Sequence, residues 1–325
     1  GAHAITMKIC LVKTSSMGDV IHTLPALTDA AQALKDFSVD WVVEENFAEI
    51  PRWHFAVDKV IPIALRRWRK APCATETRHQ WQNYRKLLQQ TQYDAVIDAQ
   101  GLLKSAIFAT RLARGEKHGY DRKSIREPLA SWFYDKKYAI SYQQHAVERI
   151  RQLFAQALGY SLPTDLGDYA LARHFSAQQE STPYVLLFHS TTRTEKHWPE
   201  NYWHEFIGAC VEKQIAVRLP WGTPQEHARA ERLAAGYNGV QVLPKLTLSQ
   251  LASQIAGAQA VISVDTGLAH LTAALDKPAI TLYGATDPTL IGAYGQNQHY
   301  LQADSMQEIQ PNQAFNEFLR LLNQR

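Results

Sequence analysis

The segment that follows the first apolar run of the chain carries one carboxylate among several hydroxyl side chains. Ser15, Ser16 and Asp19 lie there around Gly18, which lets the backbone turn sharply. Two interpretations of Asp19 are open: a helix cap that satisfies free backbone amides, or a general base that takes a proton from a substrate hydroxyl. The segment lacks both the glycine pattern of a dinucleotide fingerprint and the Gly-Lys-Ser/Thr of a phosphate loop, so neither function is predicted.

The strongest anion-binding pattern is Asp265-Thr266-Gly267, which follows an apolar run and opens a helical stretch. Free backbone amides at such a helix start, together with the helix dipole, bind anions. His270 lies four residues after Thr266 and shares its helix face, although packing at the domain edge is an alternative role. No third ligand accompanies Asp265 and His270 at a suitable spacing, so no metal site is expected.

Two further segments of the second half carry groups that suit a nucleotide. Thr191, Thr192 and Lys196 lie in one polar stretch, where their hydroxyls and ammonium can bind phosphate oxygens. The alternative for this stretch is an ordinary solvated loop. Glu226 can accept hydrogen bonds from both hydroxyls of a ribose, as acidic residues do in other nucleotide-binding folds. A first-turn helix acid is an equally good interpretation of Glu226.

A basic segment at residues 65–70 surrounds one tryptophan with four cations: Arg66, Arg67, Arg69 and Lys70. Guanidinium groups bind phosphate in a bidentate manner, and this segment should hang over a cleft because it follows a predicted strand. Residues 1–160 hold 23 Lys and Arg against 16 Asp and Glu, whereas residues 161–325 hold 11 against 15. Unless the run is only a solvated face, the basic half should meet a phosphorylated molecule, an acidic membrane or nucleic acid.

Strand-like and helix-like stretches alternate through both halves, and they must position these groups. In the first half, strands are predicted at 8–13, 39–43, 57–63 and 94–99, with helices at 18–35, 78–92 and 144–158. In the second half, strands are predicted at 184–189, 215–219, 240–243, 260–264 and 279–283, with helices between them and a terminal helix at 313–322. This pattern predicts two doubly wound α/β domains that face each other across a cleft, joined by a looser segment at 159–183.

The composition excludes several classes of protein. The 325 residues are 46% apolar and 20% charged, which is typical of a folded chain of about two domains. No run of about 18 apolar residues is present, so no membrane-spanning helix is expected. Cys10, Cys73 and Cys210 are isolated from one another, which indicates a reducing compartment and excludes a zinc ribbon.

With these segments in view, the chain resembles the family of bacterial lipopolysaccharide heptosyltransferases over essentially its whole length from Met7. The most specific matches are KTSSMGDVIHTLPALTDA at 13–30, VIDAQGLLKSA at 96–106 and SVDTGLAHLTAALDKPAITLYGATDP at 263–288. Shorter matches are IPIALRRWRKA at 61–71, KHWP at 196–199 and LPWG at 219–222. The KTSSMGD opening and the hydroxyl-rich stretch before KHWP are similar to the members that attach the first heptose.

This resemblance implies a glycosyltransferase B architecture, with an acceptor domain at 7–165, a donor domain at 183–310 and a last helix at 311–325 that packs back on the N-terminal domain. The implied reaction is inverting and needs neither metal nor cofactor. It moves L-glycero-D-manno-heptose from ADP-L-glycero-β-D-manno-heptose, here called ADP-heptose, to the first Kdo of Kdo2-lipid A. The implied location is cytoplasmic, on the anionic inner face of the bacterial inner membrane, where the protein would be peripheral.

The resemblance also assigns roles to individual residues. Asp19 matches the general base of the family, which favours that interpretation over the cap. The donor positions are matched by Thr191, Thr192, Lys196, Glu226, Leu246, Asp265, Thr266, Gly267 and His270. The acceptor positions are matched by Ser16, Arg66, Arg67, Arg69, Lys70 and Arg126. Leu246 departs from the family pattern, because members can carry methionine there.

Other functions stay open on the sequence alone. A family member can act on a later, already heptosylated core acceptor. A nucleotide-sugar epimerase can share the two-domain architecture but needs no acceptor. A catalytically idle protein could dock acidic lipid through its basic half. A nucleic-acid partner is not expected, because the chain contains no recognisable nucleic-acid-binding module.

Overall fold

The computed structural model describes residues 6–175 and 182–324 and divides into two compact units, Gly1–Ala170 and Leu171–Arg325. The first unit extends beyond its predicted end at residue 165, because residues of the connection pack onto it. The Asp165 carbonyl accepts a hydrogen bond of 2.9 Å from Arg151, and a Cβ on Gly167 would lie 2.6 Å from the Cβ of Pro25. Residues 176–181 of the predicted connection lie outside the described residues.

The first unit is built on a six-stranded sheet in which every neighbouring pair is parallel. Its strands are β1 (Met7–Val12), β2 (Phe37–Glu44), β3 (Val57–Ile63), β4 (Ala95–Asp98), β5 (Lys117–Tyr120) and β6 (Lys136–Tyr138), in the order β3-β2-β1-β4-β5-β6. The four apolar strands were predicted, since strands covered on both faces read as apolar runs. The prediction missed β5 and β6, whose short sequences KHGY and KKY carry no apolar run.

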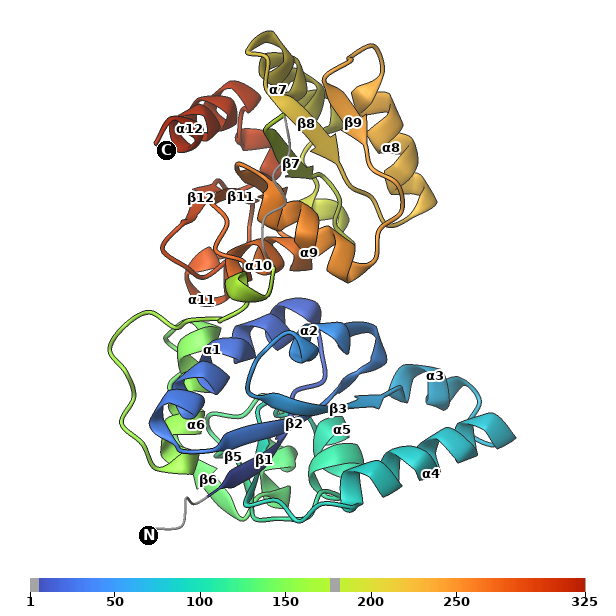
Figure 1. Cartoon of the computed structure of the whole chain (residues 1–325), viewed down its shortest axis with the longest axis vertical. Coiled ribbons are helices and arrows are strands. Elements are labelled where there is room, and N and C mark those ends of the chain that lie inside the picture. The colour runs from blue at the N-terminus through green and yellow to red at the C-terminus, as the bar shows by residue number, and fades with distance from the viewer. Residues whose placement is uncertain (1–5, 176–181, 325) are drawn as a thin grey trace. The chain divides into compact units, whose positions relative to one another are not determined.

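Helices cover both faces of this sheet (Figure 1). On one side, α1 (Met17–Ala33) packs against α6 (Ala146–Leu158). On the other, Tyr84 and Leu88 of α4 (Thr75–Gln89) join a buried cluster with residues of β1, β2 and β4. The shorter helices of the unit are η1 (Glu45–Phe47), α2 (Glu49–Arg52), α3 (Leu65–Lys70), α5 (Leu103–Ser105), η2 (Ala106–Thr110) and η3 (Pro128–Phe133).

The second unit repeats the plan with a second all-parallel sheet. Its strands are β7 (Tyr184–Phe188), β8 (Ala216–Leu219), β9 (Val240–Val242), β10 (Val261–Val264), β11 (Ala279–Tyr283) and β12 (Gln298–Gln302), in the order β12-β11-β10-β7-β8-β9. Its helices are η4 (Ala172–His174), η5 (Thr194–Lys196), α7 (Glu200–Glu212), α8 (Pro224–Ala234), α9 (Leu248–Gly257), α10 (Gly267–Ala274), α11 (Pro288–Ile291), η6 (Met306–Glu308) and α12 (Pro311–Asn323). Only β12 was not predicted among its strands, because its sequence QHYLQ is mostly polar.

The strand order of each sheet reverses once, and the position of that reversal decides where a ligand can bind. In the first sheet the reversal lies between β1 and β4, and in the second between β7 and β10. In doubly wound sheets the loops that follow the two strands at such a reversal leave in opposite directions, and ligands bind in the crevice between them at the carboxyl ends of the strands. The prediction of two doubly wound α/β domains is confirmed, and each contains one such switch point.

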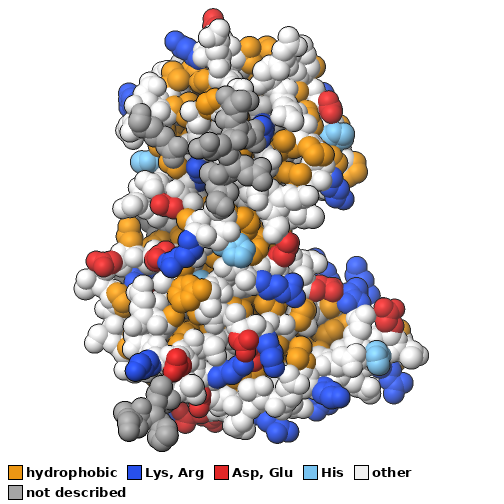
Figure 2. Space-filling view, in the orientation of Figure 1, with side chains coloured by type: hydrophobic (Ala, Val, Ile, Leu, Met, Phe, Trp, Pro, Cys, Tyr) orange, Lys and Arg blue, Asp and Glu red, His pale blue; other side chains and the backbone are white. Residues whose placement is uncertain are grey.

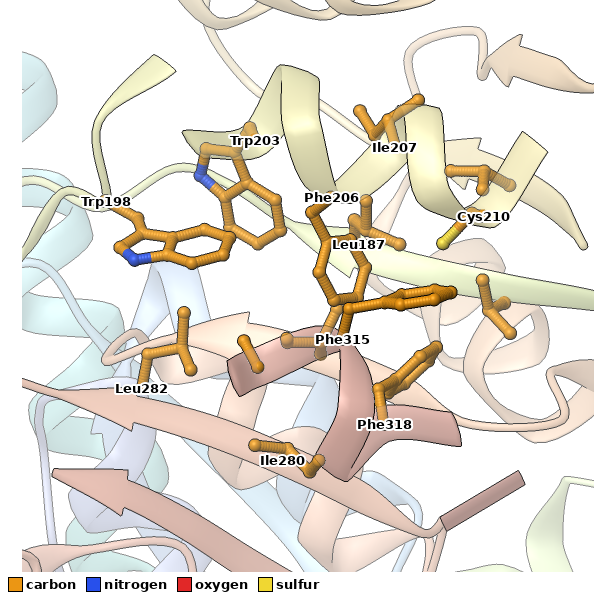
Figure 3. Packing of buried hydrophobic residues seen from close by; sticks show 14 of the residues in the cluster. Leu187, Trp198, Trp203, Phe206, Ile207, Cys210, Ile280, Leu282, Phe315 and Phe318 are labelled. Carbon is orange, nitrogen blue, oxygen red and sulfur yellow. The ribbon is translucent and has the colours of Figure 1, made fainter. Parts of the chain in front are cut away.

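The last helix differs from the prediction that it packs back on the N-terminal domain. Phe315 and Phe318 of α12 lie in the core of the second unit, with ring centroids 5.6 and 5.5 Å from that of Phe206 on α7 (Figure 3). The helix therefore belongs to the second unit. The apolar stripe of α12 was predicted correctly from the sequence, but such a stripe does not indicate which unit's hydrophobic core the helix will pack against.

We predict that Arg151 is the main polar tie between α1, α6 and the connection. Its guanidinium holds the Asp29 carboxylate by bonds of 2.6 and 3.1 Å, and both side chains are almost fully buried. Arg151→Met should destabilise the first unit by about 3–5 kcal/mol, because it leaves the buried Asp29 carboxylate unpaired. Urea unfolding followed by circular dichroism measures this loss.

The matched control is Arg67→Ala, which removes a guanidinium that grips Glu45 in the same bidentate way at the surface. An exposed pair of this kind contributes little to stability. Equal shifts of the unfolding midpoint in the two variants would contradict the prediction.

Candidate functional site

The residues predicted to bind the donor all lie on loops at the carboxyl edge of the second sheet, or at the helix starts that follow them. They are Thr191, Thr192 and Lys196 after β7, Glu226 after β8, Leu246 after β9, and Asp265, Thr266, Gly267 and His270 after β10. The structure therefore brings together, on one sheet edge, residues that the sequence spreads over more than 70 positions. This edge is where ligands bind in doubly wound sheets.

An ion pair spans the switch point of the second sheet. The Lys196 ammonium lies 2.9 Å from the Asp265 carboxylate, and the two side chains are 25% and 12% exposed. The pair joins the loop after β7 to the loop after β10. It places a partly desolvated cation at the crevice, where an ammonium attracts anions more strongly than it would in bulk water.

The start of α10 adds backbone donors to the same crevice. Thr266 is the N-cap residue, and its side chain makes no capping hydrogen bond to the first turn. The Ala269 amide donates a 3.0 Å hydrogen bond to the Thr266 carbonyl, but the Thr266 side chain caps neither of the two amides before it, those of Gly267 and Leu268. Amides that a side-chain cap leaves open at a helix N-terminus can bind an anion. His270 is 8% exposed and lies further along α10.

A cavity of about 210 Å³ lies beside the ion pair. Its lining combines Lys196 and Asp265 with the loops that follow β11 and β12, at residues 284–286 and 304–307. The sequence analysis assigned no residue of the first of these loops to the donor site and missed the second loop altogether, because β12 itself was missed. The signal that could have found it is the capping box Ser305-x-x-Glu308.

Glu226 takes up the structural role that the sequence left open. Its Oε1 accepts hydrogen bonds of 2.8 Å from the Gly222 amide and 3.3 Å from the Thr223 amide, which completes the capping box of α8. Both bonds end on one oxygen, so the cap does not use Oε2. A cap and a ribose contact are therefore compatible in this carboxylate.

Among the described residues, no three His, Cys, Asp or Glu side chains come together as ligands for a metal ion. The Asp265 carboxylate is paired with the Lys196 ammonium.

In the first unit, Asp19 lies at the carboxyl edge of the sheet as the third residue of α1. Its Oδ2 accepts a 3.0 Å hydrogen bond from the Ser16 amide, and Ser16 is the N-cap residue of the helix. Both residues are exposed. The capping interpretation of Asp19 is thus confirmed, but a single accepted bond leaves the exposed carboxylate with capacity to accept a proton.

Lys13 is a buried cation beside this loop that sequence reasoning did not single out. The residue is 8% exposed, and its ammonium donates a 2.9 Å hydrogen bond to the carbonyl of Ala99, which follows β4. Burial lowers the pKa of Lys13, and the carboxylates of Asp19 and Asp98 oppose that shift. A lysine directly after an apolar strand was the available signal.

The basic segment forms the short helix α3 rather than a loop over the sheet edge. Trp68 is buried and fixes the helix, while Arg66, Arg69 and Lys70 are exposed. Arg67 is engaged by Glu45, so its fork is already occupied. Figure 2 shows blue Lys and Arg side chains around α3 and α4.

Arg126 and Glu44 complete the carboxyl edge of the first sheet. Arg126 is exposed after β5, and its backbone nitrogen packs beside Gly101 of the β4 loop. Burial and the neighbouring Glu45 raise the pKa of Glu44 to about 7, while Arg66 and Lys104 act in the opposite direction. The carboxyl edge of this sheet therefore combines cations with an acid that titrates near neutrality.

No helix within residues 6–175 and 182–324 is long and apolar enough to cross a bilayer. Three aromatic residues follow one another at 132–134. Trp132 is 75% exposed, whereas Tyr134 is buried. The trio thus divides between surface and core.

Comparisons with known proteins agree with this geometry. A model of glycosyltransferase family 9 (heptosyltransferase) matches residues 81–317. Lipopolysaccharide heptosyltransferase 1 of Escherichia coli strain K12 is 57% identical over 299 residues, which cover 91% of this chain and 94% of that protein. The structure of E. coli heptosyltransferase WaaC with ADP has a TM-score of 0.94 at 54% identity and covers 97% of this chain and 100% of its own. The same enzyme with ADP-2-deoxy-2-fluoro heptose gives 0.91 at 53%, with coverages of 97% and 99%.

We predict that the loop after β7 loses stability in mild acid. His189 begins this loop, its Nε2 lies 3.0 Å from the Pro220 carbonyl oxygen, and its own carbonyl accepts from Arg229. Burial, reinforced by the Arg229 charge, lowers the pKa of His189 from 6.5 to about 4. Between pH 6.5 and 4, His189 is therefore protonated in the unfolded chain but neutral in the folded chain. The free energy of unfolding should fall over this range by at most about 3 kcal/mol as the pH is lowered.

The measurement is the free energy of unfolding between pH 7 and 4 for the natural chain and His189→Gln. The variant keeps a side-chain nitrogen for Pro220 but has nothing to protonate, so its pH dependence should be shallower. Identical slopes would show that other groups carry the acid sensitivity.

Proposed function

Because the chain belongs to glycosyltransferase family 9, the heptosyltransferases, we propose that it transfers L-glycero-D-manno-heptose from ADP-heptose to the first Kdo of Kdo2-lipid A. In this proposal the second unit binds the donor and the first binds the acceptor. The reaction then requires the carboxyl edges of the two sheets to close on one another, so that Asp19 reaches the acceptor hydroxyl beside the donor.

The observation that carries this proposal is the ion pair between Lys196 and Asp265 at the start of α10. An ADP leaving group gains negative charge as its bond to the sugar breaks. In this proposal the ammonium and the first-turn amides of α10 would face such charge and would stabilise it without a rearrangement of solvent. In this role they replace a divalent cation, so we propose that transfer needs neither metal nor cofactor.

The other donor residues are assigned by their places on the same edge. Thr191 and Thr192 precede Lys196 in the β7 loop and would hold phosphate oxygens by hydroxyl hydrogen bonds. Glu226 would accept from the ribose through Oε2, and Leu246 would contact the base. Gly267 and His270 complete the donor site on α10.

The acceptor assignments follow the charge of the first unit. Kdo2-lipid A carries phosphates and carboxylates, and the exposed Arg66, Arg69, Lys70 and Arg126 offer it cations at one sheet edge. Ser16 would donate or accept a hydrogen bond beside Asp19. Arg67 would need to leave Glu45 before it could bind an anion. The same basic surface would hold the protein peripherally at the anionic inner face of the inner membrane.

The chemistry is an inverting displacement at the anomeric carbon. Asp19 takes the proton of the acceptor hydroxyl, the new bond forms from that oxygen to the anomeric carbon, and the bond to the β-phosphate breaks on the opposite face. ADP leaves with the electron pair and is stabilised by Lys196. Closure of the two units would exclude water that could hydrolyse the donor.

We predict that Asp19→Asn slows turnover strongly without loss of donor binding. The amide oxygen still accepts from the Ser16 amide, so the cap of α1 is kept, but the side chain no longer takes a proton. The value of kcat should fall about 10²- to 10⁴-fold, the usual contribution of a general base. Steady-state kinetics and ADP-heptose calorimetry measure the two effects, and a variant with full kcat would remove Asp19 from the mechanism.

Lys196→Met tests the leaving-group site. It should lower kcat by about 10²- to 10³-fold or raise the donor KM, since it removes a donor aimed at developing charge. Arg193→Ala is the matched control, because Arg193 is a well-exposed cation of the same loop, 3.8 Å from Glu195. Equal losses in both variants would mean that only the general charge of the loop matters.

A further inference from the structure

The stretch VIDAQGLLKSA at 96–106 has no part in the mechanism above, yet it crosses the switch point of the first sheet. Gln100 follows β4, and its side-chain Oε1 accepts hydrogen bonds from the Thr14 amide at 3.0 Å and the Ser15 amide at 3.4 Å. Thr14 and Ser15 lead from β1 into α1, whose third residue is Asp19. The Gln100 side-chain oxygen thus fixes the backbone of the loop that leads to Asp19.

Gln100 is itself fixed by a buried carboxylate. Asp98, the last residue of β4, is fully buried, and its Oδ1 accepts from the amides of Gln100 at 2.9 Å and Gly101 at 3.0 Å. Gly101 has a φ of +70°, a conformation that closes this turn without strain only in glycine. The other carboxylate oxygen accepts from the Thr110 hydroxyl at 2.7 Å. The turn at Gln100 and Gly101 is therefore held rigidly at the end of β4 by hydrogen bonds to the buried Asp98 carboxylate.

The carbonyls of Lys13 and Thr14 are held by β2. Trp41 on β2 donates to the Lys13 carbonyl at 2.8 Å, and the Glu44 amide donates to the Thr14 carbonyl at 3.0 Å. The carbonyls of the loop are thus tied to β2, whereas the amides of Thr14 and Ser15 are tied to Gln100. Loss of the Gln100 oxygen would release the side of the loop that faces the switch point.

We propose that Gln100 is a positioning residue that sets where the Asp19 carboxylate stands. This inference rests on the proposed role of Asp19 as the base. A displacement of about 1 Å at a reacting group can cost about 10²-fold in rate. Gln100 requires no contact with either substrate to have this effect.

The hydrogen bonds use only an acceptor oxygen, and that fact defines the two variants. Gln100→Glu keeps an oxygen at the same place, so it should retain most of the natural kcat. Gln100→Met has a similar length without an acceptor, and its kcat should fall about 10- to 100-fold. The affinity for ADP-heptose should be unchanged in both, because the donor residues lie in the other unit.

Tyr93→Phe is the matched control for a general loss of stability. The Tyr93 hydroxyl donates a buried 2.7 Å hydrogen bond to Asp40 in the same sheet, and it lies before β4, at the amino end rather than the carboxyl end. This variant should lower the unfolding midpoint and leave kcat unchanged. A fall in kcat with Tyr93→Phe as large as with Gln100→Met would assign the effect to stability and overturn the proposal.

Amide hydrogen exchange gives a readout that does not depend on activity. Protection of Thr14 and Ser15 should drop in Gln100→Met and persist in Gln100→Glu. The proposal is overturned if Gln100→Met keeps both the amide protection and kcat. It is also overturned if Gln100→Glu is as slow as Gln100→Met, because the amide nitrogen of Gln100 would then be contacting the acceptor substrate directly. An Asp19→Asn variant with natural kcat would instead remove the proposed base and leave the loop measurement standing.

Discussion

The reversal of strand order in each parallel sheet is the constraint on which the rest of the molecule depends. All carboxyl-end loops of a parallel sheet lie along one edge, but only at the reversal do neighbouring loops part and leave room for a ligand. In both units a side-chain contact spans this point: the Gln100 oxygen to the β1 loop in the first, and Lys196 to Asp265 in the second. The candidate site is thus built twice on one plan.

The two contacts differ in charge, and the difference suits the two halves of a transfer reaction. In the first unit a neutral amide oxygen fixes the β1 loop by accepting from two backbone amides, and this contact depends on geometry rather than on charge. In the second unit an ion pair holds an ammonium at the start of α10, where the diphosphate of the proposed reaction would gain negative charge.

The sequence predicts the interior of this fold better than its edges. Runs such as the apolar β7 are buried on both faces and are visible as strands, whereas β5, β6 and β12 lie at or next to sheet edges and resemble loops. The loops that carry the site were predictable, because they follow the visible strands. The hydrogen-bond partners within these loops were not predictable. Gln100 and Thr14 are 86 positions apart, and nothing in the sequence near either residue indicates that they pair. For the same reason the stripe on α12 was visible, but the core that it joins was not.

The central claim, that a carboxylate of one unit and a diphosphate site of the other cooperate to move a sugar, is tested most directly by the product. Mass spectrometry would follow Kdo2-lipid A and its singly heptosylated form, each incubated separately with ADP-heptose and the natural chain. The account predicts that Kdo2-lipid A gains one heptosyl unit with release of one ADP and that the heptosylated acceptor is unchanged. Transfer to the heptosylated acceptor alone, or conversion of ADP-heptose in the absence of any acceptor, would contradict it.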